Sequence, residues 1–216
     1  RPVRAGGPRD VLCLKRPIVN IQAVFFDLGG VILRTEHQSP RQHLAERLGM
    51  EYEDLDRLVF ASDSAYKASI GKITEEEHWA EMAKRLRRPP AEANALRDEF
   101  FGGDALDLTL IAFLRSLKPR LHTGLISNAW SGLRAYIVHH KFDDAFHSLT
   151  ISAEVGVTKP EAKIYRLALE QAGVQAENAV FVDDFIENVE GARAVGMSAI
   201  HFRDTETALR ELNQML

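Results

Sequence analysis

Acidic or polar side chains directly follow three apolar runs of this chain. Asp27 ends the run I-Q-A-V-F-F and is followed by two glycines. Ser127 and Asn128 follow G-L-I, and Asp183 and Asp184 follow A-V-F-V. Carboxylates are the hard oxygen ligands that Mg²⁺ prefers, and a hydroxyl with backbone N–H groups at a helix N-terminus can hold a phosphate. If the three runs are neighbouring strands, these residues predict a joint site for a divalent cation and an oxyanion.

Each of these residues also has an ordinary structural explanation. An aspartate at a strand end often caps a turn, and a Ser-Asn pair often caps a helix. Two adjacent acids can be a solvated turn before a helix, although they repel each other unless a cation or donors lie nearby. Asn188 lies one helical turn after Asp184 and could face the same cleft. Lys159, in T-K-P-E-A-K-I-Y, could hold an anionic nucleophile and substrate together by charge.

The elements that must position these residues alternate along the chain. Apolar runs predict strands, and amphipathic segments between them predict helices. The predicted strands cover 21–26, 122–127, 147–152, 179–184 and 198–202, and the predicted helices cover 106–117, 131–142, 161–173 and 188–197. This alternation predicts an α/β fold with a parallel sheet flanked by helices on both faces. Active sites of such sheets lie at the carboxyl ends of the strands.

One region, 35–103, interrupts the alternation with helical signals alone. Ser39-Pro40 predicts a helix start with a capping serine, Thr74 with Glu77 forms a capping box, and Pro89-Pro90 ends that helix. An inserted all-helical cap is the simplest interpretation. The predicted domains are a loose N-terminal tail at 1–19, a core at 20–34 and 104–216, and the cap at 35–103.

Composition narrows the function classes. The 216 residues are 45% hydrophobic and 27% charged, which is typical of soluble globular proteins. The net charge of −4 gives no reason to expect nucleic-acid binding. A single cysteine, Cys13, cannot form an intrachain disulfide, so a cytoplasmic location is expected. No apolar run approaches the roughly 20 residues that span a membrane.

Four strings together resemble the motifs of the haloacid dehalogenase superfamily of aspartate-nucleophile hydrolases. They are F-F-D-L-G-G-V-I, L-I-S-N, T-K-P-E-A-K-I-Y and V-F-V-D-D-F-I-E-N-V-E-G-A, in the family's order, and the resemblance covers about residues 21–204. It implies a Rossmann-like core with the first strand central and a helical cap inserted after that strand. The cap string G-K-I-T-E-E-E-H-W resembles the subgroup that contains sugar-phosphate phosphatases and the phosphatase domain of soluble epoxide hydrolases.

The resemblance also implies residue roles. Asp27 would be the nucleophile and a Mg²⁺ ligand, and Gly29 would offer its backbone carbonyl to the metal. Asp184 would bind the metal directly, and Asp183 directly or through water. Ser127 and Asn128 would hold the phosphoryl group, and Lys159 would offset the charge of Asp27 and phosphate. Gly29 departs from the family pattern, because most phosphatases of the family carry an aspartate there as general acid and base.

Three functions stay open at this point. The favoured one is a Mg²⁺-dependent phosphomonoester hydrolase that forms an aspartyl-phosphate on Asp27 with a small phosphorylated metabolite. The second is a 2-haloacid dehalogenase, which needs no acid at position 29 but has no use for the Asp183-Asp184 pair. The third is a catalytically weak binding or regulatory protein, which only Gly29 favours. The sequence leaves open whether the protein is a monomer or a homodimer.

Overall fold

The computed structural model describes residues 20–216, so the predicted N-terminal tail lies outside the described residues. Its centre is a five-stranded parallel sheet in the order β5-β4-β1-β6-β7. The strands are β1 (Ala23–Phe26), β4 (His122–Ser127), β5 (Ser148–Ile151), β6 (Ala179–Asp183) and β7 (Ser198–His201). These strands match the predicted runs, and the α/β fold with a helical insertion is confirmed. The first strand lies in the centre of the sheet.

The register of the central strands brings their carboxyl ends level. Phe26 of β1 pairs with Leu125 of β4 and with Val182 of β6. One residue further on, the Asp27 N–H donates to the Val182 carbonyl at 2.9 Å. The residues that follow the three strands therefore lie at one edge of the sheet.

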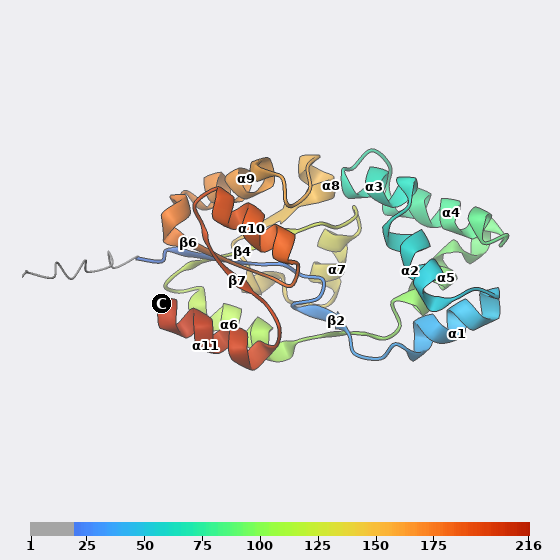
Figure 1. The fold of residues 1–216 in the computed structure, drawn as a ribbon, viewed down its shortest axis with the longest axis horizontal. Coiled ribbons are helices and arrows are strands. Elements are labelled where there is room, and N and C mark those ends of the chain that lie inside the picture. The colour runs from blue at the N-terminus through green and yellow to red at the C-terminus, as the bar shows by residue number, and fades with distance from the viewer. Residues whose placement is uncertain (1–19) are drawn as a thin grey trace, which may run out of the picture.

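Alternate residues of β1 pack against different layers. Val24 and Phe26 lie in an apolar cluster with residues of three helices, α6 (Leu108–Leu117), α7 (Leu133–His139) and α11 (Thr205–Met215). Ala23 and Phe25 pack instead with residues of α9 (Ala162–Ala172) and α10 (Ile186–Ala194). The two groups of helices lie on opposite faces of the sheet (Figure 1). Because both faces are covered, every residue of β1 is buried, which explains its nearly continuous apolar sequence.

A helical cap is inserted between two short strands, β2 (Leu33–Thr35) and β3 (Asp104–Leu106), which pair antiparallel. Its helices are α1 (Ser39–Leu48), α2 (Tyr52–Phe60), α3 (Asp63–Ser69), α4 (Glu75–Arg85) and α5 (Ala93–Phe100), with a 3₁₀ turn at Pro90–Glu92. Residues of α1, α2, α4 and α5 form a separate apolar core at the end of the molecule away from α9 and α11 (Figure 1).

Several local predictions need correction. The capping box of Thr74 and Glu77 is present. The N-cap residue of α1, however, is Gln38, whose side chain makes no capping hydrogen bond, and Ser39 is the first helical residue instead of the N-cap. The β2–β3 ribbon was not predicted, because three-residue strands are too short to show alternation. Two helices were also missed, α11 and the four-residue α8 (Ser152–Val155).

The cap touches the core next to the end of β4. Trp130, two residues after Asn128, packs against His78 of the cap, with the two ring centroids 4.5 Å apart. The adjacent Ser131 hydroxyl accepts the N–H of Glu75 at 3.0 Å, at the start of α4. The cap helix is thus attached to the segment that directly follows the predicted phosphate-binding residues.

Among residues 20–216, no helix is long and apolar enough to span a bilayer.

Arg41 joins the cap to the connecting ribbon, and its loss is expected to destabilise the fold. The Arg41 side chain is 8% exposed, pairs with Asp104 at 3.1 Å and with Asp56 at 3.3 Å, and lies over the Phe100 ring. Arg41→Met leaves Asp104 buried without its cation, so we expect the free energy of unfolding, measured by urea denaturation, to fall by roughly 3–5 kcal/mol. The exposed pair of Arg57 supplies the control, because Arg57→Met should cost about 1 kcal/mol or less. Equal losses in both variants would contradict a special role of Arg41.

Candidate active site

Asp27 lies at the carboxyl end of β1 with its side chain buried. Its Oδ1 accepts the Leu28 N–H at 2.7 Å and lies 2.8 Å from Lys159 Nζ. The pKa of Asp27 is raised to about 6, chiefly by burial and also by the neighbouring Asp183, whose effects outweigh the lowering by Lys159. The carboxylate is therefore desolvated and close to a positive charge, and the two contacts of Oδ1 fix its orientation.

Lys159 is the charge partner of two carboxylates. Its side chain is completely buried, and Nζ lies 2.6 Å from Asp183 Oδ2 as well as 2.8 Å from Asp27 Oδ1. The prediction that this lysine lies beside Asp27 agrees with these distances. Because two buried carboxylates repel each other, the ammonium between them lowers the cost of holding both ionised at one strand edge.

The acid pair after β6 has two different environments. Asp183 is fully buried, and its carboxylate accepts hydrogen bonds from Asn188 Nδ2 at 3.0 Å and from the Phe185 N–H at 2.8 Å. The Oδ1 of Asp184 is buried and has no hydrogen-bond partner within residues 20–216. Burial and the adjacent Asp183 raise the pKa of Asp184. An unsatisfied buried carboxylate oxygen is costly, and a cation at this place would remove that cost.

Asp27, Asp183 and Asp184 bring one carboxylate oxygen each to within 4.8 Å of one another. These hard oxygen donors, few in number and partly reachable by solvent, fit Mg²⁺, which is bound by a few carboxylates and keeps several waters. Asn188 joins the site through Asp183, as its place one helical turn on suggested. The other residues of the site come from the loops after β4 and before α9.

Gly29 and Gly30, which follow Asp27 closely, differ in the side chains that they would permit. Gly30 has φ +76°, and a Cβ there would lie 2.1 Å from Asp184 Oδ2. Gly29 has an ordinary φ, and a Cβ there would meet nothing within 4 Å. Only the second glycine is therefore required by the close approach of Asp184 to the backbone.

Gly30→Ala is expected to weaken Mg²⁺ binding by roughly 10-fold or more, because the methyl group would push Asp184 away. Gly29→Ala is the matched control and should bind Mg²⁺ with nearly unchanged affinity, since the space above it is open. Isothermal titration of both variants with MgCl₂ measures the difference. Equal affinities would show that Asp184 does not hold the ion from this position.

The structure gives Ser127 and Asn128 different surroundings. Ser127 is buried, with 2% of its surface exposed. Asn128 is exposed, yet its side chain bonds to the backbone of Lys159, a contact the sequence did not suggest because 31 residues separate the two. The following helix α7 begins at Leu133, two residues after the expected start at Ser131.

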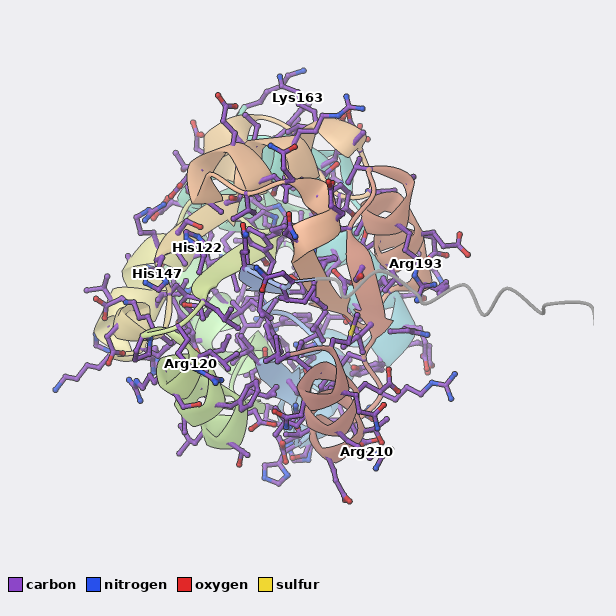
Figure 2. All side chains as sticks on the ribbon, turned by 90° about the vertical axis from the view of Figure 1, so that its left-hand side faces the viewer. Arg120, His122, His147, Lys163, Arg193 and Arg210 are labelled. Carbon is purple, nitrogen blue, oxygen red and sulfur yellow. The ribbon has the colours of Figure 1, made fainter. Side chains whose placement is uncertain are left out.

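Two histidines lie away from this site, whereas His201 Nε2 lies 2.9 Å from the Asp184 carbonyl oxygen. His122, at the start of β4, and His147 stack with ring centroids 5.0 Å apart. Both lie at the end of the molecule that faces the viewer in Figure 2, the end away from the cap. Both are remote from the acidic group, which lies at the opposite end of β4.

A family model described as haloacid dehalogenase-like hydrolase matches residues 21–196, which is most of the chain. The chain belongs to the haloacid dehalogenase-like hydrolases. It is 27% identical over 200 residues to a sesquiterpene phosphatase of Aspergillus oryzae, covering 90% of this chain and 96% of that protein. It is also 27% identical over 214 residues to the rat bifunctional epoxide hydrolase 2, covering 90% of this chain and 39% of the larger relative.

Solved structures share the fold. A haloacid dehalogenase family enzyme from Bacteroides thetaiotaomicron, in complex with magnesium and inorganic phosphate, matches with a TM-score of 0.74. The match is 18% identical in sequence and covers 88% of this chain and 99% of that one. This haloacid dehalogenase-like hydrolase therefore has the helical-cap architecture of its family, and the predicted family resemblance is confirmed.

Proposed function

We propose that the protein is a Mg²⁺-dependent phosphomonoester hydrolase that acts through an aspartyl-phosphate on Asp27. The observation that carries the proposal is the convergence of Asp27, Asp183 and Asp184 at one sheet edge, where Lys159 pairs with the first two. A metal-free dehalogenase would have no use for this acidic group. The similarity to a phosphatase over nearly the full length of both chains supports the same reaction class.

The residues divide the work of the reaction. Lys159 and the Leu28 N–H hold Oδ1 of Asp27, which leaves Oδ2 to attack phosphorus. The new P–O bond forms as the bond from phosphorus to the ester oxygen breaks, and that oxygen leaves with the electron pair. Ser127 and the backbone N–H of Asn128 would bind the phosphoryl oxygens. Mg²⁺, held by Asp27, Asp183, Asp184 and the Gly29 carbonyl, would neutralise the charges that meet there.

Water then completes the reaction. It attacks phosphorus, breaks the bond to Asp27 and yields inorganic phosphate, while its proton passes to solvent. Position 29 carries no acid to protonate the departing ester oxygen, so esters with acidic leaving groups are favoured. We therefore propose anomeric sugar phosphates, aryl phosphates or acyl phosphates of small metabolites as substrates.

A phosphate-release panel over these three classes and simple alkyl phosphates tests the proposal. With MgCl₂ we expect turnover of at least one class, and with EDTA we expect none, because the three carboxylates then repel the phosphate. No turnover of any class, with phosphate binding retained, would favour the regulatory alternative. Metal-independent halide release from a 2-haloacid would favour the dehalogenase.

A further inference from the structure

The contact between Asn128 and Lys159 joins two loops that are far apart in the sequence. Asn128 Oδ1 accepts the Lys159 N–H at 2.8 Å, and Asn128 Nδ2 donates to the Lys159 carbonyl at 3.0 Å. Because a backbone N–H only donates and a carbonyl only accepts, these two bonds also define the orientation of the amide. One side chain thus holds both polar groups of a single residue's backbone.

Asn128 is exposed, so its side chain contributes little to the packing of the core. Its partner, by contrast, has a completely buried side chain whose Nζ lies between Asp27 and Asp183. A lysine side chain has many rotamers, so the place of its ammonium depends on how firmly the backbone beneath it is held. Asn128 fixes that backbone on the side of β4, and Asp183 fixes the ammonium on the side of β6.

We propose that Asn128 is a positioning residue that acts on phosphoryl transfer through Lys159. The proposal rests on the proposed function for its kinetic consequences, but the positioning itself is a property of the protein alone. The side-chain amide holds the Lys159 backbone, and the ammonium in turn stays between the two carboxylates. Direct contact of the Asn128 side chain with the phosphoryl group is the competing role.

The first test needs no turnover. In the Mg²⁺-loaded protein labelled with ¹⁵N-lysine, Lys159 is the lysine whose ammonium should be protected from exchange with water, because its side chain is completely buried. Asn128→Ala should broaden or shift that signal. Asn178→Ala is the matched control, because it removes a side-chain amide bond to a backbone carbonyl (Asn20, 2.8 Å) at the far end of the sheet. An unchanged Lys159 signal in Asn128→Ala would overturn the proposal.

The second test separates the two roles by a double-mutant cycle. In the wild-type background, Asn128→Ala should lower kcat/KM, and the affinity for inorganic phosphate, by about 10- to 100-fold, as for other groups that orient a ligand-binding side chain. In a Lys159→Met background, Asn128→Ala should cost less than about twofold, since the partner it acts through is gone. A similar loss in both backgrounds would show that Asn128 contacts the phosphoryl group itself.

The two tests distinguish their own failure from that of the proposed function. If the wild-type protein releases no phosphate, the proposed function is wrong, and the NMR comparison still decides whether Asn128 positions Lys159. If Lys159→Met does not fold, the same comparison of Asn128→Ala with Asn178→Ala gives the answer. A shifted signal without any kinetic loss would confine Asn128 to a structural contact and overturn its role in the reaction.

Discussion

The Asp27→Asn variant is expected to release phosphate roughly 10⁴-fold more slowly than the wild type, or not measurably, as when other covalent nucleophiles are removed. The amide keeps the size of the carboxylate but has no charge with which to attack phosphorus. It also supplies one anionic oxygen fewer to a cation. The Lys159 ammonium keeps Asp183 as its partner at 2.6 Å, so the buried charge is not left alone.

The measurement is phosphate release under saturating MgCl₂ with the best substrate of the panel. Asp143→Asn is the matched control, because Asp143 is an exposed acid at the start of a 3₁₀ turn, and it should leave the rate unchanged. Brief incubation with substrate followed by acid quench and mass spectrometry should find a phosphoryl group on wild-type Asp27. A rate for Asp27→Asn within tenfold of wild type would exclude the aspartyl-phosphate route.

Gly29→Asp is expected to raise kcat for alkyl phosphates by about 10² to 10⁴, the usual contribution of general acid–base catalysis. The protein has room for the change, because a Cβ at position 29 meets nothing within 4 Å and the backbone there is not left-handed. The new carboxyl group would follow the nucleophile by two residues and could protonate the departing ester oxygen. Esters with acidic leaving groups need no such proton, so their rates should change little.

The comparison that isolates the acid is Gly29→Asp against Gly29→Asn, which has the same size and no proton to give. Rates are measured on an alkyl phosphate and an aryl phosphate in parallel. An equal gain in both variants would assign the effect to the altered loop instead of to acid catalysis. No gain in either variant would mean that leaving-group protonation does not limit this hydrolase.

Much of this molecule can be predicted from local signals. The buried strands carry nearly continuous apolar runs that end in the site residues, so both the sheet and the polar residues at its edge are readable. The β2–β3 ribbon is not, because its three-residue strands are only partly buried and show no period. The N-cap of α1 cannot be predicted correctly, because Ser39-Pro40 has the composition of a helix start, whereas the observed N-cap residue, Gln38, makes no side-chain hydrogen bond.

By itself the sequence determined the strand and helix pattern, the helical insertion and the set of acids at the strand ends, because each depends on neighbours within a few positions. Tertiary structure alone decided how those residues meet. The register of β1 with β6 places Asp27 beside Asp183, and packing buries Lys159 between them. Tertiary structure also decided two further contacts. They are the hydrogen bond between Asn128 and the Lys159 backbone and the close approach of Asp184 to Gly30, which leaves no room for a side chain there. Distances between residues far apart in the chain, and the burial that shifts their pKa values, exist only after the layers have packed.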